Sequence, residues 1–519
     1  MTDVFRREFD VVVVGGGGSG LAAAVSAAEH GAQVAVLEKR PELGGTTALA
    51  VGSFTASETA YQQRAGVEDA VAAHIEDAAK FAPPEIEARN NEELRAFLLR
   101  HAGDTLAWLT NMGLAFYGPT PEPPNRAMRM HNVVPGARAY VLSLQRRLQK
   151  LNGAVFMNAP VTKLVRENGR VTGAVADLDG HPHEFAARQG VVLAAGDYAS
   201  APDIITQHKG PEFAAVEGIN PHATGDGHRL CEAVGAKLIN MDVTYGPELR
   251  FAPPGRLSLL RRLPASGWIR TLMGALMPYV PRPMMNAIIK RELVTWQHPE
   301  DSLFDDGAVL VNAEGRRFCN EKDSPAREIA IARQPGKCAY ILLDKRLVAR
   351  YSDWPHFVST APEIAYAYVK DYLNLRPDVA IAESSLEAIA QARGLPPDAL
   401  EDAVTGFNRY VVGEAPDPFG RTGDTEPLRE DDWVLLGPAK AYFTITEGSP
   451  AINLEMQVLD ETGTPIPGLY AVGQNGMGGQ VLWGHGLHIA WAITSGRLVG
   501  HALANGAAAT ETRDGSQSD

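Results

Sequence analysis

The sequence predicts an α/β fold built on a parallel sheet with an attached β-meander. Two observations predict this fold class. The first is a strand–turn–helix–strand unit over residues 9–38, the unit from which parallel sheets are built. The second is a series of short β-rich segments that begins at residue 154 and ends in the apolar strand 190–196.

The N-terminal unit begins with residues 9–14, which are largely β-branched and predict a strand. A glycine-rich turn follows and opens a helix over residues 21–30. Gly31 ends this helix, because glycine readily adopts the positive φ of a helix terminus. A second apolar strand covers residues 34–37 and ends at Glu38.

The turn carries the pattern G-x-G-x-x-G at Gly15, Gly17 and Gly20. The first glycine permits a tight turn, the second lets backbone approach a pyrophosphate, and the third lets the helix pack closely on the strand. Gly18 and Ser19 complete the turn, where a helix N-terminus offers N–H groups and a positive dipole to phosphates. The turn therefore predicts a phosphate-binding site.

Glu38 follows the second strand, about 20 residues beyond the last glycine of the motif. An acid at this position can accept hydrogen bonds from ribose hydroxyls. Strand, glycine turn, helix, second strand and terminal acid together predict a dinucleotide site, whereas a glycine motif alone is weak evidence.

The loop after Glu38 indicates which dinucleotide binds. It begins at Lys39 and contains four closely spaced small residues, Gly44, Gly45, Thr46 and Thr47. This pattern resembles the fumarate reductase and 3-ketosteroid dehydrogenase superfamily of FAD enzymes, in which the loop wraps the FAD pyrophosphate and isoalloxazine. The resemblance implies FAD, and we expect non-covalent binding because residues 44–48 include no histidine.

The resemblance extends from residue 9 to about residue 503. It implies a Rossmann-type FAD-binding domain with an inserted α+β cap that contributes to the substrate site. The expected division is 1–243 for the first part of the FAD-binding domain, 244–441 for the cap and 442–504 for the second part. Residues 505–519 are rich in small and polar residues and predict a disordered tail.

Two segments of the expected cap carry local signals. Residues 307–321 resemble the superfamily's hairpin, with a turn at Glu314 and Gly315. Residues 383–412 predict two helices, of which Ser385 starts the first and Gly394 separates it from the second.

The resemblance also implies further FAD contacts. Backbone at Val161 corresponds to the adenine site, and Asp226 is expected to cap a helix near the diphosphate or ribityl chain. The final helix is expected to begin at residue 489 and to direct its dipole at the flavin. The remaining expected FAD contacts are Ala195, Gly196, Gly473, Gln474, Gly486, His488 and Ile489.

Composition limits the other partners. The net charge of -14 argues against nucleic acid as a general partner. The three cysteines are scattered, which gives no metal-binding pattern and suits a reducing cytoplasm. The polar start is not typical of a signal peptide, and no apolar run is long enough to span a bilayer. We therefore expect a cytoplasmic protein.

One region reverses the overall charge. Residues 249–291 are basic and rich in Leu, Met and Pro, with no Asp or Glu. Three interpretations stay open for this region: a lid, a subunit interface or cap helix, and peripheral membrane contact through residues 256–291. The oligomeric state also stays open.

The superfamily transfers a hydride between flavin and a carbon near a carbonyl or carboxylate, with a proton moving at the neighbouring carbon. This sequence departs from fumarate reductases, which clamp a dicarboxylate with histidines and an arginine. The corresponding positions lie near Tyr245, within residues 448–453 and at Trp483, and they hold neither residue type here. Arg327 is the nearest match to their proton-donating arginine. A dicarboxylate is disfavoured, because it would lose its cationic partners.

The sequence also departs from ketosteroid dehydrogenases. Their terminal motif resembles residues 484–489, so the N–H of Gly486 is a candidate for polarising a ketone. Two of their tyrosines, however, correspond to Leu482 and Ala326. Candidate replacements for the acid–base pair are Tyr245, Tyr117, His131, His485 and His488.

Tyr117 and His131 belong to a loop that also holds Arg126 and Arg129. The matching loop of fumarate reductases approaches the active site, while a solvated basic loop is the alternative. Arg327 with either arginine is a candidate for holding a single carboxylate.

The predicted function is FAD-dependent desaturation of a cyclic ketone, such as a 3-ketosteroid or an oxo-cyclohexane carboxylate. The first alternative is reduction of an α,β-unsaturated carboxylate, and the second is a flavin electron-transfer subunit. An external electron acceptor is expected, either a quinone, a dye-like molecule or a flavin or iron–sulfur carrier. The direction of reaction stays open.

Overall fold

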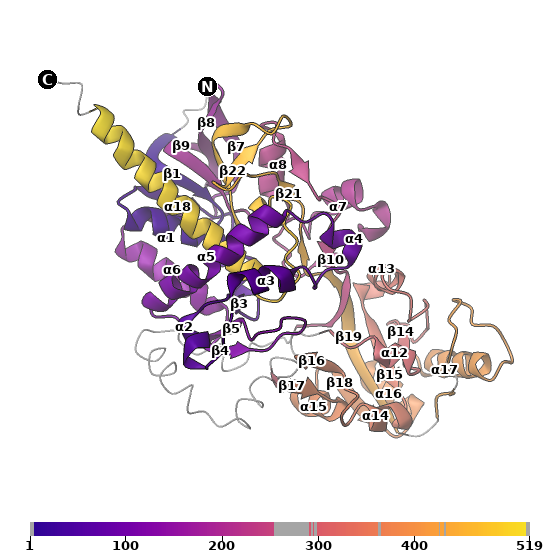
Figure 1. Ribbon diagram of the computed structural model, residues 1–519. Helices are drawn as coiled ribbons and strands as arrows, with labels where there is room; N and C mark the ends of the chain where they lie inside the picture. Colours follow the sequence, from indigo (N-terminus) through magenta and orange to yellow (C-terminus); the bar gives the residue numbers. More distant parts are fainter. Residues whose placement is uncertain are drawn as a thin grey trace.

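The computed structural model describes residues 5–253, 290–291, 294, 298–361, 365–424, 426–429 and 432–514, with side chains up to residue 506. Both ends of the described chain build one body around the main sheet, and the middle of the chain builds a second (Figure 1). Each body has its own hydrophobic core.

The main sheet has the strand order β22-β23-β9-β1-β2-β6. Neighbours from β23 to β6 are parallel, and β22 pairs antiparallel with β23. Val11, Val12 and Val13 of β1 are fully buried, as a central parallel strand requires. The bounds are β1 Phe5–Val14, β2 Val34–Leu37, β6 Ala154–Phe156, β9 His181–Leu193, β22 Gln457–Leu459 and β23 Pro465–Ala471.

The expected β-meander is formed by β7 (Val161–Glu167), β8 (Arg170–Leu178) and β9, paired antiparallel. The predicted strand 190–196 is the end of β9, which stops at Leu193. Ala195 and Gly196 therefore lie in the loop at the carboxyl edge of the sheet, where α/β folds bind ligands.

Helix α1 (Gly18–Glu29) packs beside α18 (Leu487–Asp514), the long terminal helix in Figure 1. Two glycines allow this close contact, because a Cβ at Gly496 or Gly500 would lie 2.2 Å from the carbonyl oxygen of Ser19 or Ala23. The contact fixes where the N-terminus of α18 points. Helix α18 also continues beyond the boundary expected at residue 504, and residues 515–519 lie outside the described residues.

The second body is organised by β19, which pairs with β10, β13, β15 and β18, while β15 also pairs with β14. The expected hairpin is only partly formed. Its turn is present, since the Gly315 N–H donates to the Asn312 carbonyl, but β14 pairs with β15 rather than with the returning limb. The bounds are β10 Glu217–Gly218, β13 Glu248–Phe251, β14 Val309–Val311, β15 Ala339–Leu343, β18 Ala380–Glu383 and β19 Trp433–Phe443.

The two helices expected over 383–412 are α16 (Leu386–Arg393) and α17 (Pro397–Val411). The Ser385 side chain caps the first, and Gly394 ends it in the left-handed conformation. The second core also takes in Tyr198 and α7 (Pro202–His208), which lie within the segment expected for the first body. Other helices here are α12 Ser302–Asp305, α13 Ala326–Ala332, α14 Lys345–Arg350 and α15 Val369–Leu375.

A helical region follows residue 55, and α5 is its longest helix. Its helices are α2 Ala60–Arg64, α3 Val71–Ala78, α4 Pro84–Glu87 and α5 Glu92–Asn111, with α6 Arg138–Lys150 after it and α8 Asp226–Glu232 further on. One short sheet is formed by β3 Ser53–Thr55, β5 Met130–Val134 and β4 Ala115–Thr120. Further strands pair two by two: β11 Leu238–Ile239 with β21 Ser449–Pro450, and β12 Thr244–Tyr245 with β20 Ile445–Thr446. In the second body, β16 Ser359–Ala361 pairs with β17 Ala365–Ala367.

The basic segment cannot be placed among these elements, since residues 254–289 lie outside the described residues. At its end, Lys290 forms an ion pair with Asp371 at 3.0 Å. Across the described parts of the chain, no helix is both long and apolar enough to cross a membrane.

Candidate active site

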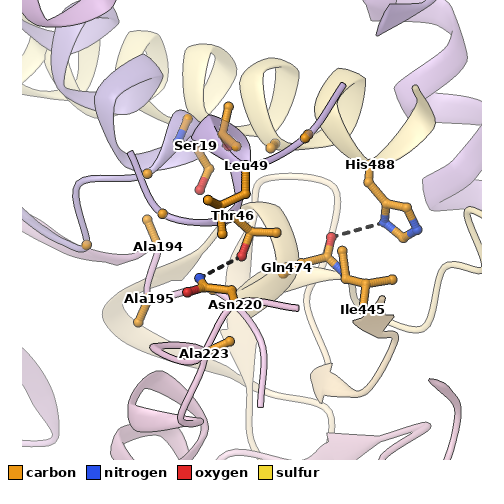
Figure 2. A pocket seen from close by; sticks show the side chains of 18 of the residues that line it. Ser19, Thr46, Leu49, Ala194, Ala195, Asn220, Ala223, Ile445, Gln474 and His488 are labelled. Atoms are coloured by element: carbon orange, nitrogen blue, oxygen red, sulfur yellow. Dashed lines mark hydrogen bonds between the residues drawn. The ribbon is translucent and has the colours of Figure 1, made fainter. Parts of the chain in front are cut away.

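A long cavity lies between the two bodies. Its walls come from the carboxyl end of β1, the N-terminus of α1, the loop 45–53, the loop after β9, β20 and the turn before α18. Figure 2 shows side chains from these segments converging on one space. The cavity therefore lies at the sheet edge that the glycine motif predicted.

The glycine turn forms one end of the cavity. Helix α1 begins after Gly17 without a side-chain cap, so its first turn is available to a ligand. Gly20 cannot be replaced freely, because a Cβ there would lie 2.0 Å from the carbonyl oxygen of Gly15. The Gly44 N–H donates to the Gly16 carbonyl oxygen at 3.0 Å, which ties the second loop to the turn.

Glu38 and Lys39 lie on the cavity wall with fixed side chains. The carboxylate of Glu38 accepts the N–H groups of Gly16 at 2.8 Å and Arg40 at 2.9 Å. Lys39 Nζ donates to the carboxylate of Asp226 at 2.7 Å. Asp226 does not cap its helix as expected, because Gly225 is the N-cap residue and no side chain caps α8.

The threonine loop reaches across the cavity. Asn220 Nδ2 donates to Thr46 Oγ1 at 2.9 Å, as drawn in Figure 2, and the Gly18 N–H donates to Thr47 Oγ1 at 3.2 Å. Asn220 was not expected from the sequence, because it belongs to no recognised motif.

Most of the expected FAD contacts line this cavity. Those on its wall are Gly15, Gly17, Gly18, Ser19, Glu38, Lys39, Gly45, Thr46, Thr47, Val161, Ala195, Gly196, Asp226, Gln474, Gly486, His488 and Ile489. Three expected contacts do not line the cavity and instead support its wall from behind: Gly20, Gly44 and Gly473. The Gly473 N–H, for example, donates to Ser495 Oγ.

The residues present fit FAD. An added Cβ at Gly17 would find no heavy atom closer than 4.0 Å, and one at Gly196 would find none within 4 Å, so the space beside both is open. An uncapped helix N-terminus at this space suits a pyrophosphate. Glu38 and Val161 lie where the adenosine half is expected, and Gln474 and His488 line the part nearest α18.

The far end of the cavity is aromatic. The rings of Tyr245 and Trp483 meet edge to face, with centroids 5.2 Å apart. Both residues also line a second cavity that adjoins the first. Burial raises the pKa of Tyr245 to about 12, so its hydroxyl stays protonated at neutral pH and can donate a hydrogen bond.

His485 lies beside these rings and pairs with Glu122. Glu122 Oε1 lies 2.7 Å from Nδ1 of His485 and accepts its backbone N–H at 2.6 Å. The surrounding protein partly desolvates the imidazole, which alone would lower its pKa, but the hydrogen bond and charge of Glu122 outweigh this. The pKa of His485 therefore lies above 6.5.

Arg250 brings a cation to the same end of the cavity. It donates to Glu248 at 2.7 Å and to Thr444 Oγ1 at 3.3 Å. Burial raises the pKa of Glu248, but the Arg250 charge and hydrogen bond outweigh burial and hold the pKa below its usual range. The described part of this end therefore holds two base–acid pairs, Arg250 with Glu248 and His485 with Glu122.

The expected catalytic residues separate into two groups. Tyr245 and Gly486 line the cavity, and Gly486 has φ +82° at the turn before α18. Tyr117, His131 and Arg327 do not belong to its described lining.

The environments of two of these residues show how they are used in the fold. His131 is fully buried against Thr59 and the Phe54 carbonyl, and burial lowers its pKa to about 4. Arg327 donates to Glu328 at 2.7 Å and Asp301 at 2.7 Å inside the second body.

The loop arginines are also engaged elsewhere. Arg129 is fully buried and bridges Asp69 at 2.8 Å and Asp77 at 2.7 Å, while Arg126 donates to Asp77 at 2.9 Å. These contacts join the loop to α3. The loop therefore contributes Arg129 to a buried ion-pair network, while Arg126 joins the edge of that network half exposed.

Three residues at the site had no signal strong enough to be found from sequence: Asn220, Glu122 and Arg250. Arg250 had a weak one, because Glu248 and Arg250 alternate on β13 and therefore point to the same face. Glu122 comes from a proline-rich loop far from His485 in the chain, so only the fold brings the two together.

Comparison with known proteins gives relatives along almost the whole chain. An NADH:fumarate oxidoreductase of Klebsiella pneumoniae is 25% identical over 510 residues, covering 97% of this chain and 48% of the relative. A urocanate reductase of Eggerthella lenta is 27% identical over 484 residues, covering 90% of this chain and 70% of the relative. The chain thus spans about half the length of the Klebsiella protein.

Among solved structures, the open conformation of a flavocytochrome c3 fumarate reductase superposes with a TM-score of 0.70. The two are 24% identical, and the match covers 96% of this chain and 78% of the other. This likeness supports the α/β fold. The family model described as "FAD binding domain" matches residues 10–269 and 291–483, so the chain belongs to this family of FAD-binding proteins.

Proposed function

We propose that this protein is an FAD-dependent oxidoreductase of CH–CH groups that desaturates a cyclic ketone next to its carbonyl. The proposal rests on the far end of the cavity. There the rings of Tyr245 and Trp483 form aromatic walls, and the hydroxyl of Tyr245 is a hydrogen-bond donor. Aromatic walls suit a ring-shaped, largely apolar molecule. The tyrosine hydroxyl suits a single carbonyl oxygen.

Charge argues against a dicarboxylate at the same end. The two bases at this end are already paired, Arg250 with Glu248 and His485 with Glu122, so a dianion would have to compete with these carboxylates for its partners. A dianion that did not displace these partners would lie close to their carboxylates, and like charges at close range repel. A neutral ketone carries no such penalty.

The bound FAD would accept a hydride from the substrate carbon β to the carbonyl. The chain must then take the proton that leaves the α-carbon and stabilise the negative charge that develops on the carbonyl oxygen. Tyr245, protonated at neutral pH, can donate a hydrogen bond to that oxygen. The N–H of Gly486 lines the same cavity and is the second candidate donor.

His485 is the residue best suited to hold the proton. Its Nδ1 is bonded to Glu122, which leaves Nε2 for the cavity. The hydrogen bond and charge of Glu122 raise the pKa of His485, so they stabilise the imidazolium that forms when the ring takes the substrate proton. The ring can therefore accept a proton during desaturation and return it in the reverse reaction.

A second candidate function is reduction of an α,β-unsaturated monocarboxylate. Arg250 at the cavity favours it, because one arginine can hold one carboxylate. The relatives named as fumarate oxidoreductase and urocanate reductase support the same direction of reaction.

Anaerobic stopped-flow spectroscopy of the FAD-loaded protein tests both candidates. Loss of the oxidised flavin band with 3-ketosteroids or substituted cyclohexanones supports desaturation. Reoxidation of the dithionite-reduced protein by unsaturated acids, without any response to ketones, favours the second candidate. Silence with all compounds in both directions would contradict both.

The Tyr245→Phe variant makes the test specific for the site. We expect at least a tenfold slower flavin reduction by the active ketone, since a donor to the developing charge contributes roughly 2.7–4 kcal/mol. The matched control is Tyr470→Phe, on β23, which does not line the cavity. Equal rates in the wild type and Tyr245→Phe would contradict the role of Tyr245.

A further inference from the structure

His488 lies in the first turn of α18 and lines the FAD cavity, with its side chain 22% exposed. Its Nδ1 lies 3.1 Å from Oε1 of Gln474 (Figure 2). The orientation of this amide is fixed, because Nε2 of Gln474 donates to the Thr446 carbonyl at 3.0 Å. Oε1 must therefore accept, and Nδ1 of His488 must carry a proton.

The other ring nitrogen faces a carboxylate. Nε2 of His488 lies 3.4 Å from Oε1 of Glu447, which is fully buried. Within the described part of the chain, neither oxygen of Glu447 accepts a hydrogen bond. A buried carboxylate without hydrogen bonds is costly, and a proton on Nε2 is the compensation that this geometry offers.

A second buried acid, Asp197 in the loop after β9, interacts electrostatically with His488. Asp197 is buried, and its Oδ1 accepts the Ala199 N–H at 3.2 Å. Burial raises the pKa of Asp197 to about 6, the charge of His488 opposes that rise, and Glu447 adds to it. Glu447 therefore contacts His488 directly and Asp197 acts on it through its charge, whereas His485 pairs with Glu122.

We propose that His488 is held as an imidazolium by Glu447 and raises the reduction potential of the bound FAD. The cation lines the cavity, whereas Glu447 does not, so the positive end of the pair is the end presented to the cofactor. The N-terminus of α18 adds positive potential at the same place. A cation there stabilises the negative charge of reduced flavin. The proposal does not depend on the substrate.

The test is the two-electron midpoint potential of the FAD-loaded protein, measured against a reference dye during slow enzymatic reduction. We expect His488→Asn to favour the oxidised form at least tenfold more than wild type, a fall of about 30 mV for a two-electron couple. The control is His181→Asn, an exposed histidine at the start of β9. His488→Gln serves as the second variant if His488→Asn binds FAD poorly.

Glu447→Gln separates charge from structure. At pH 6 its potential should equal or exceed that of wild type, because the cation stays and the anion is removed. At pH 8.5 it should fall toward that of His488→Asn, because the carboxylate no longer holds the second proton. The proposal is overturned if His488→Asn matches the His181→Asn control, or if Glu447→Gln follows wild type at every pH.

Discussion

At the scale of single residues, the His485–Glu122 pair links stability to pH. The pKa of His485 is raised in the folded protein, so the pair stabilises the fold fully below about pH 6.5. This contribution is lost as the pH rises through the raised pKa. We therefore expect Glu122→Gln to lower Tm more at pH 6 than at pH 9.

Thermal unfolding of wild type and variant at both pH values checks this prediction. Glu414→Gln is the matched control, because Glu414 forms a solvent-exposed pair with Arg409. Equal losses of Tm at pH 6 and pH 9 would show that the imidazolium does not contribute to stability through Glu122.

Arg327 provides a second test at the residue scale. Its side chain is 4% exposed and is bonded to Glu328, which is 1% exposed. Removing one partner leaves a buried charge unpaired, which costs about 3–5 kcal/mol. We expect Arg327→Ala to lower the free energy of unfolding in urea by this amount, and the exposed Arg409→Ala to change it little. A loss no larger than that of Arg409→Ala would contradict the structural role.

At the scale of elements, the close contact between α1 and α18 depends on glycines, which have no side chain to separate the helices. A Cβ at Gly500 would lie 2.2 Å from the Ala23 carbonyl oxygen, so Gly500→Ala forces the helices apart. We expect a destabilisation of about 1–3 kcal/mol and weaker FAD binding, because α18 positions His488 and Ile489 at the cavity.

Gly406 in α17 is the control for this prediction. No heavy atom lies within 4 Å of an added Cβ there, so Gly406→Ala should stabilise the protein by about 0.5–1 kcal/mol through helix propensity. Opposite signs for the two substitutions, measured by urea unfolding, are the expected result. The same sign in both would show that interhelical packing does not decide the outcome.

At the scale of the whole molecule, the sequence predicted those parts of the site whose residues are consecutive in the chain. The strands, glycine turn and acid at residues 9–38 are consecutive in the chain, and the structure matches them closely. The far end of the cavity was not predictable in the same way. Glu122 meets His485 across 363 residues, and Glu447 faces His488 from the loop between β20 and β21, so neither pairing leaves a local pattern.

Residue type alone was also a poor guide where burial decides the role of a side chain. Arg327 and His131 carry chemistry that suits catalysis, and sequence alone does not distinguish a buried structural partner from a cavity residue. Their hydrogen bonds to Glu328 and Thr59 became visible only with the fold. Asp226, expected as a helix cap, instead pairs with Lys39 at the cavity wall.

The position of the cavity between the two bodies leads to a prediction for the whole molecule. Its walls include Glu38 and Val161 from the first body and Arg250 and Thr444 from β13 and the β19–β20 region. FAD that contacts both should couple their unfolding, and it binds only the folded protein. At 100 times its dissociation constant, FAD should add about 2.7 kcal/mol to the free energy of unfolding.

Differential scanning calorimetry of the protein with FAD removed and then restored checks this coupling. We expect a higher Tm and a single sharper transition with FAD, because both bodies must then release the same ligand to unfold. FMN is the matched ligand control, since it lacks the adenosine half that would contact the Glu38 and Lys39 end. FMN should therefore restore less stability at equal concentration. If FMN and FAD raised Tm equally, the adenosine end of the cavity would contribute nothing to binding, against the fit of the glycine turn.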